Sequence, residues 1–243
     1  MSSTSSPVAE WIDIAPDLRG YLARPAGDGK HPAMVVFIEA FGVNGHFQTL
    51  AARLAEAGYV ALVPDIYHGD TYDYSDRDGA IGHLRTLNDE QVMQETDRAL
   101  DLLARHPSVA PIKPGVLGFC MGGRYAFLTH AAHAERVSAT ASFYGGGIAP
   151  LQDGLGRAPL LGRIPAMQGP LLLHYGTEDG SIAPDEHGRI AEALSRAGKR
   201  YGMQIYPGAG HGFFCDVRPS YHAAAAAEAW ELTLDFFSRH LGG

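Results

Sequence analysis

The sequence has few cysteines, no excess of basic residues and no long apolar run in its 243 residues. Two cysteines, Cys120 and Cys215, cannot form a disulfide framework, and a reactive free thiol requires a compartment in which thiols stay reduced. No apolar run approaches the ~18 residues of a membrane helix. Residues 1–7 have neither a basic start nor an apolar core, so we expect no secretory signal. These absences indicate a cytoplasmic protein that does not enter a membrane.

The charge balance excludes another class of partner. The formal net charge is -8, which repels polyanions, so we expect no nucleic-acid binding. A small anionic substrate would need a local arginine to overcome this field. The histidines show no HxxxH or other paired ligand spacing, so we expect no metal site, and no cofactor. The expected partner is a small molecule, bound by a monomer or a small homo-oligomer.

The composition is that of one soluble α/β domain. Hydrophobic residues make up 46% and charged residues 19% of the chain, and the length allows a sizeable core. We expect a disordered tail at residues 1–9 and a single domain over residues 10–243. Alternation of strand and helix from residue 33 onward indicates a mostly parallel, doubly wound sheet flanked by helices.

Periodicity and turn signals place the elements. Strands are expected at residues 11–14, 20–24, 33–38, 59–64, 114–119, 139–144, 171–175 and 203–206. Helices are expected at residues 50–57, 89–104, 123–131, 184–197 and 230–241. The first two strands are expected to form an antiparallel hairpin, and residues 65–78 to be irregular. The Gly- and Pro-rich insert, residues 145–169, is long enough for a small flap but not for a cap domain.

Residues 118–122 read Gly-Phe-Cys-Met-Gly at an expected junction of strand and helix. A nucleophile with glycine two positions before and two after it is the pattern of the nucleophile elbow, a strained turn that exposes the side chain. Here the nucleophile is Cys120. An isolated motif of this length also fits a buried structural cysteine in a glycine-rich turn.

Other reactive side chains follow neighbouring strands. Glu39, Asp179 and His211 each lie just beyond an expected strand, as Cys120 does, and ligands bind beyond the carboxyl ends of parallel strands. The order nucleophile, acid, histidine is that of the α/β-hydrolase triad. Taken alone, Asp179 before glycine fits turn chemistry and His211 fits a surface histidine. Their joint order is harder to obtain by chance.

The chemistry of such a set is acyl transfer. Cys120 would attack a carbonyl, His211 would move its proton, and Asp179 would orient the imidazole. The backbone N–H groups of Ala40 and Met121 would form the oxyanion hole. Glu39 could merely cap the segment after its strand, or, if it points at the elbow, it could take the thiol proton when substrate arrives.

With these motifs the chain resembles the dienelactone hydrolase (carboxymethylenebutenolidase) family. The resemblance rests on residues 39–44, residues 118–123, Asp179 and residues 210–213, and covers nearly the whole chain. It implies an α/β-hydrolase fold without a large cap domain, lactone opening through an acyl-enzyme, and a glutamate, here Glu39, that activates the cysteine.

The sequence departs from the family pattern at the residue that binds the substrate carboxylate. An arginine four residues after the histidine holds the substrate carboxylate in the founding members, and Cys215 occupies that position here. Three other arginines are candidates for this anchor: Arg77, Arg85 and Arg218. Each also fits a solvated surface charge. Aromatic side chains near strand ends indicate a pocket for a small, partly apolar ester or lactone: Phe41, Tyr144 and Phe213.

Two other functional readings stay open. A relative without activity could use the pocket for ligand binding or Cys120 as a redox sensor. A thioesterase or peptidase would use the same catalytic groups in a pocket of different shape. The complete set of four side chains and an oxyanion loop favours the hydrolase of small esters or lactones, because a binding protein would not need all of them.

Overall fold

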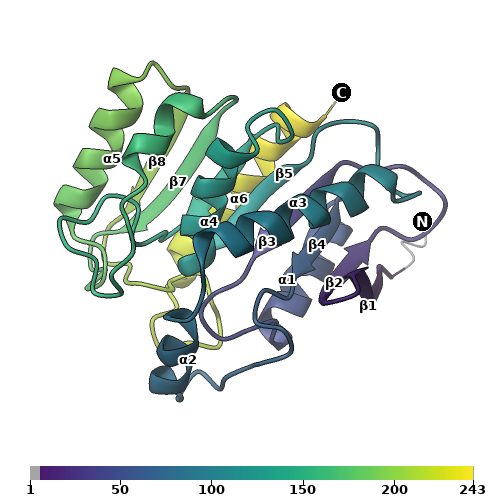
Figure 1. Ribbon diagram of the computed structural model, residues 1–243, viewed down its shortest axis with the longest axis horizontal. Helices are drawn as coiled ribbons and strands as arrows, with labels where there is room; N and C mark the ends of the chain where they lie inside the picture. Colours follow the sequence, from purple (N-terminus) through teal and green to yellow (C-terminus); the bar gives the residue numbers. More distant parts are fainter. Residues whose placement is uncertain (1–5, 243) are drawn as a thin grey trace.

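Eight strands form one mixed sheet in the computed structural model, which describes residues 6–242 (Figure 1). Their order across the sheet is β1-β2-β4-β3-β5-β6-β7-β8. The strands are β1 (Val8–Ala15), β2 (Leu18–Arg24), β3 (Ala33–Phe37), β4 (Val60–Pro64), β5 (Gly115–Phe119), β6 (Thr140–Phe143), β7 (Leu171–Gly176) and β8 (Tyr201–Tyr206). β1 and β2 pair antiparallel, as does β2 with β4, and all other neighbours are parallel. The expected α/β-hydrolase fold is confirmed.

The central strands are buried on both faces. Every residue of β3, β4 and β5 is buried, which explains their continuously apolar sequences. The helices are α1 (Gly45–Glu56), α2 (Arg77–Leu84), α3 (Asp89–Arg105), α4 (Met121–Ala132), α5 (Pro184–Arg196), α6 (Ala223–Leu241) and the short 3₁₀ helix η1 (Leu161–Ala166). None of those within residues 6–242 is long and apolar enough to cross a membrane.

Helices cover the two faces of β5 from opposite sides. A Cβ on Gly115 would press on α6 at Phe237 and Leu241, whereas one on Gly118 would press on α4 at Ala126. Residues three apart in a strand face opposite sides, so α6 and α4 lie on opposite faces of the sheet. α1 shares the face of α6, since the guanidinium of Arg53 lies 4.4 Å from the ring centroid of Trp230.

Two expectations are corrected at the edges of the elements. The tail was expected to extend to residue 9, but β1 begins at Val8, and residues 1–5 lie outside the described part. The segment expected to be irregular over residues 65–78 runs into α2, which begins at Arg77 and was not predicted. α2 has two glycines and no apolar stripe, and it is defined instead by its Asp76 cap, whose Oδ1 accepts the Gly79 N–H at 3.0 Å.

The insert, residues 145–169, forms a small flap rather than a domain. Within the described residues it contains no strand, and its only helix is η1. Arg124 of α4 anchors it at two points, donating to the carbonyls of Gly147 and Ala158, while a third contact pairs this guanidinium with Asp89 of α3. Because Arg124 is fully buried, the flap is fixed to the helix that follows the elbow.

Buried His174 in β7 makes the fold sensitive to acid. Its ring nitrogens lie 2.9 Å from the Tyr206 hydroxyl and 3.1 Å from Thr233 Oγ1, and burial lowers the pKa of His174 to about 3. In the unfolded chain this histidine takes up a proton below the ordinary histidine pKa of ~6.5, whereas in the folded chain it stays neutral down to about pH 3. The free energy of unfolding therefore falls as the pH drops from ~6.5 toward 3.

We expect His174→Gln to reduce this acid loss. Between pH 7 and pH 5 the free energy of unfolding should fall by about 2 kcal/mol less than in the wild type, because about 1.5 pH units lie below the unfolded pKa. Urea unfolding at the two pH values measures it. His31→Gln is the control, and an unchanged acid loss in His174→Gln would contradict the assignment.

Candidate active site

The turn between β5 and α4 has the geometry that the glycine motif predicts. Cys120 has φ 57° and ψ -121°, a strained backbone conformation that residues other than glycine rarely adopt. A Cβ on Gly122 would lie 2.5 Å from the carbonyl oxygen of Ile38, and one on Gly118 would overlap the Gly122 backbone. Only glycine fits these two positions, and the turn presents Cys120 half-buried at the sheet edge.

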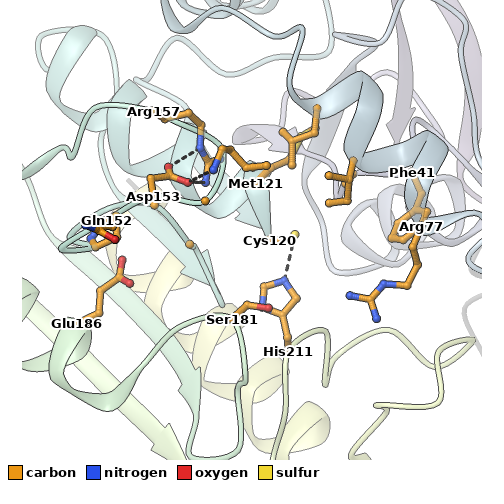
Figure 2. A pocket seen from close by; sticks show the side chains of 18 of the residues that line it. Phe41, Arg77, Cys120, Met121, Gln152, Asp153, Arg157, Ser181, Glu186 and His211 are labelled. Carbon is orange, nitrogen blue, oxygen red and sulfur yellow. Dashed lines mark hydrogen bonds and ion pairs between the residues drawn. The ribbon is translucent and has the colours of Figure 1, made fainter.

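Three of the predicted side chains form one chain of hydrogen bonds. His211 Nε2 lies 3.1 Å from Cys120 Sγ (Figure 2), and His211 Nδ1 lies 2.8 Å from Asp179 Oδ2. The other oxygen of Asp179 accepts the N–H groups of Ser181 and Ile182 at 2.8 and 3.1 Å. The carboxylate is thus held in one orientation at the end of β7, and it fixes the imidazole that follows β8.

The surroundings favour the charged form of His211. Burial disfavours the imidazolium, but the Cys120 sulfur and the Asp179 carboxylate outweigh burial and raise the pKa of His211 to about 10. At neutral pH the imidazole of His211 therefore holds its proton. The proton on the His211 imidazole is therefore available to a leaving group.

Two backbone N–H groups are free next to the thiol. Within residues 6–242, the N–H groups of Ala40 and Met121 donate no hydrogen bond to a protein atom. Met121 is the first residue of α4, where an N–H has no partner inside the helix. Ala40 follows β3 and lines the same cavity as Cys120. Both groups are available to an oxyanion.

Glu39 has partners that the sequence did not predict. Its carboxylate is fully buried and accepts the Tyr144 hydroxyl at 2.9 Å and Arg218 Nη1 at 3.2 Å. Burial and the neighbouring Glu39 raise the pKa of Tyr144 well above its usual value, so the phenol remains a donor. In the described residues, neither oxygen of Glu39 is hydrogen-bonded to Cys120. In this conformation the Glu39 carboxylate contacts Tyr144 and Arg218 and not the thiol.

The Arg218 guanidinium reaches Glu39 across the loop that carries His211. It lies 5.7 Å from the ring centroid of Phe41 and directly against Gly212, which has φ +78° and where a Cβ would overlap it. Glycine at this position thus admits the arginine. Arg218 comes seven positions after His211 in the sequence, whereas Cys215 occupies the fourth position after it. The arginine nevertheless lies next to the Glu39 carboxylate.

A cavity of about 280 Å³ opens above Cys120. Of the residues predicted to contact substrate, Phe41, Arg77 and Arg218 line it. Arg85 does not, because it ends α2 and is exposed. Tyr144 and Phe213 are buried behind the wall, with their ring centroids 5.3 Å apart. These two support the site from beneath and do not form its surface.

The opposite wall contains residues that sequence reasoning did not identify. Asp153 and Arg157 of the insert form an ion pair, with Oδ2 and Nε 2.7 Å apart, and Glu186 of α5 lies beyond them (Figure 2). No spacing in the sequence marks these residues, because they reach the cavity from a loop and from a helix start. Among residues 6–242, no group of three or more His, Cys, Asp or Glu side chains could hold a metal ion.

The comparisons with known proteins agree with the geometry. The model of the dienelactone hydrolase family matches residues 18–241. A Synechocystis sp. protein named as a carboxymethylenebutenolidase is 36% identical over 230 residues, covering 92% of each chain. A Bradyrhizobium sp. protein named as a 2-oxo-3-(5-oxofuran-2-ylidene)propanoate lactonase is 33% identical, covering 99% of this chain and 98% of its own.

A solved structure shows the same fold. The crystal structure of a dienelactone hydrolase from Klebsiella pneumoniae subsp. pneumoniae superimposes with a TM-score of 0.89 at 30% identity, covering 97% of this chain and 100% of that chain. The similarity therefore extends over the sheet, the elbow and the loops that carry the acid and the histidine. With a family match over nearly its whole length and a fold that matches, the chain belongs to the dienelactone hydrolase family of the α/β-hydrolase superfamily.

Proposed function

We propose that this protein hydrolyses small carboxylic esters or lactones through an acyl-enzyme on Cys120. The observation that supports it most is the continuous chain from Cys120 Sγ through His211 to Asp179, with contacts of 3.1 and 2.8 Å. A nucleophile, a proton carrier and its orienting carboxylate at hydrogen-bond distance are the parts that covalent acyl transfer requires.

In the first half of the proposed reaction, Glu39 takes the Cys120 proton on substrate entry, and the thiolate attacks the carbonyl carbon and forms a C–S bond. The carbonyl oxygen becomes an oxyanion that the N–H groups of Ala40 and Met121 stabilise. As the carbonyl re-forms, the C–O bond of the ester breaks, and His211 gives its proton to the leaving alkoxide. In a lactone this new hydroxyl remains attached to the acyl group.

In the second half, water attacks the thioester carbon. His211, now neutral, accepts a proton from the water, and the tetrahedral intermediate expels Cys120 as a thiolate with release of the carboxylic acid. Asp179 stabilises the imidazolium in both halves through its contact with Nδ1. The cycle ends when Glu39 returns the proton to the Cys120 thiolate, with His211 again an imidazolium.

Arg77 is the candidate anchor for an acidic group on the substrate. It lines the cavity, and within the described residues it forms no ion pair with a protein carboxylate. Arg218 also lines the cavity, but its guanidinium is committed to Glu39. A free thiol nucleophile fits a reducing compartment, which supports the proposed cytoplasmic location.

A hydrolysis screen tests the proposed activity. The wild type and Cys120→Ala are assayed side by side on lactones, p-nitrophenyl esters and thioesters. Turnover of esters or lactones that disappears in Cys120→Ala supports the proposal. Thioester turnover alone would assign a thioesterase instead, and equal activity of the two proteins would reject Cys120 as nucleophile.

Iodoacetamide at less than one equivalent is expected to label Cys120 ahead of Cys215. Cys120 is half-exposed beside an imidazolium, whereas Cys215 is fully buried. Burial, together with the Glu39 charge, raises the pKa of Cys215 to about 11, so little thiolate forms there at neutral pH. Peptide mass mapping measures the ratio. Preferential labelling of Cys215 would contradict the assignment, and loss of activity in parallel with Cys120 labelling would support it.

A further inference from the structure

Glu186 forms part of the cavity wall on the side of the insert. It lies in the first turn of α5 and is 4% exposed, and its Oε1 accepts the Ala149 N–H at 2.9 Å. In Figure 2, Glu186 and Arg77 appear on opposite sides of Cys120. The bond to Ala149 holds the carboxylate in place at the end of the cavity that lies away from the arginine.

No cation of the protein is paired with this carboxylate. Among residues 6–242, Glu186 takes part in no ion pair, because the nearby Arg189 donates its Nε–H to the Ala149 carbonyl at 2.8 Å and pairs with Asp185. Asp153 on the same wall differs, since Arg157 neutralises it. Burial, and to a smaller extent the Asp153 charge, raises the pKa of Glu186, although the backbone N–H groups of Ala149 and Ile148 and the Arg189 charge oppose the rise.

A carboxylate can accept about four hydrogen bonds. The backbone N–H groups of Ala149 and Ile148 use part of this capacity, and the rest is open to a ligand at a site where water is displaced when substrate enters. Covering a charged oxygen without giving it a hydrogen bond is costly, so a ligand group that fills the cavity here must donate a hydrogen bond or weaken binding. A substrate with an alkyl group at this end of the cavity would bind more weakly than one with a hydrogen-bond donor there.

We propose that Glu186 forms a subsite for a hydrogen-bond donor, a hydroxyl or ammonium group, on the part of the substrate that lies on the insert side of Cys120. This rests on the proposed ester or lactone hydrolysis and narrows its substrate class. A charged hydrogen bond gained on binding corresponds to a preference of about 10- to 100-fold in KM over a methyl group of similar size.

The test uses two series of esters, since the donor could lie on either side of the scissile bond. The alcohol series is butyl, hydroxypropyl and ammoniopropyl acetate. The acyl series is the ethyl esters of butanoic acid, β-hydroxypropanoic acid and β-alanine. In at least one series, the wild type is expected to show a KM at least about 10-fold lower for both donor-bearing esters than for the alkyl ester.

Variants assign the preference to the carboxylate. Glu186→Leu is expected to remove it for both donors, and Glu186→Gln, which keeps an acceptor for the Ala149 N–H, to keep the hydroxyl preference and lose the ammonium preference. Glu192→Gln is the control, because Glu192 is an exposed carboxylate of the same helix. The Gln variant keeps the test valid if the Leu variant does not fold.

Binding separates this proposal from the proposed reaction. Calorimetric titration of the same esters into Cys120→Ala, with and without Glu186→Gln, measures the subsite without turnover. If no ester is hydrolysed but the donor preference in binding remains and depends on Glu186, the reaction is wrong and the subsite stands. Equal KM and equal affinity for donor and alkyl esters in both series, or a preference that survives Glu186→Leu, would overturn the subsite.

Discussion

Cys120→Ala is expected to lower kcat/KM for ester hydrolysis by about 10⁴-fold or more, while the fold stays intact. Cys120, the proposed nucleophile, lies at a strand end in a cavity and not in the core, so its truncation costs little packing. His211→Ala is expected to lose a similar factor, because the thiolate then has no imidazolium partner at 3.1 Å and the leaving group has no proton donor. Initial rates with a p-nitrophenyl ester measure both losses.

The double variant Cys120→Ala/His211→Ala tests whether the two residues act together or contribute independently to the rate. In the proposed reaction Cys120 and His211 act on the same step, so the double variant should lose no more than the worse single variant. Asp179→Asn is expected to fall between wild type and His211→Ala, because the amide no longer stabilises the imidazolium. Urea unfolding curves matching the wild type serve as the control for folding. Losses that multiply in the double variant would contradict a shared role.

Glu39→Gln is expected to slow acylation by about 10²- to 10⁴-fold, the usual contribution of one acid-base group. In the resting arrangement the carboxylate is held by Tyr144 and Arg218, at 2.9 and 3.2 Å, and does not contact the thiol. Our hypothesis is that substrate entry releases it so that it takes the thiol proton. An amide keeps the shape and the contact with Tyr144 but cannot accept that proton.

Single-turnover kinetics on a chromogenic ester measure the acylation rate directly. Glu178→Gln is the control, because Glu178 is exposed beside Asp179 and takes no part in the proposed reaction. Substrate affinity in Glu39→Gln should stay near that of the wild type. Acylation at the wild-type rate would mean that Glu39 only anchors Arg218 and Tyr144, and that His211 alone activates Cys120.

The sheet could be predicted from the sequence because its central strands leave a simple signal. β3, β4 and β5 are buried along their whole length, so each reads as an unbroken apolar run. α2 gives no such signal, because only Ala80 and Leu84 of its residues are buried and its glycines lower helix propensity. Its position depends on the Asp76 cap and on the contacts of His83 with Tyr67 and Tyr72.

The reactive side chains could be predicted for a related reason. Parallel strands bring their carboxyl ends to one edge, so Cys120, Asp179 and His211 had to lie close together once the strands were placed. The rotamers and partners could not be predicted. Glu39 is 105 residues from Tyr144 and 179 from Arg218, and which donor captures a carboxylate depends on packing that no local pattern records.

The specificity of the cavity was the least predictable part. Arg218 was considered a substrate anchor, yet its guanidinium is paired with a buried glutamate. Glu186 appeared to be an ordinary acidic residue in the first turn of a helix, where such residues favour the helix dipole. Only the three-dimensional placement of the insert against α5 shows that its carboxylate lines the cavity.

The acyl-enzyme itself provides the most direct test. An ester with a slow second step, identified by a p-nitrophenol burst, is mixed with the enzyme, quenched in acid during turnover and analysed by intact mass and peptide mapping. The account predicts one acyl group per chain on Cys120 that disappears once the ester is consumed, and none in Cys120→Ala. Turnover without an adduct on Cys120, or with an adduct on another residue, would contradict it.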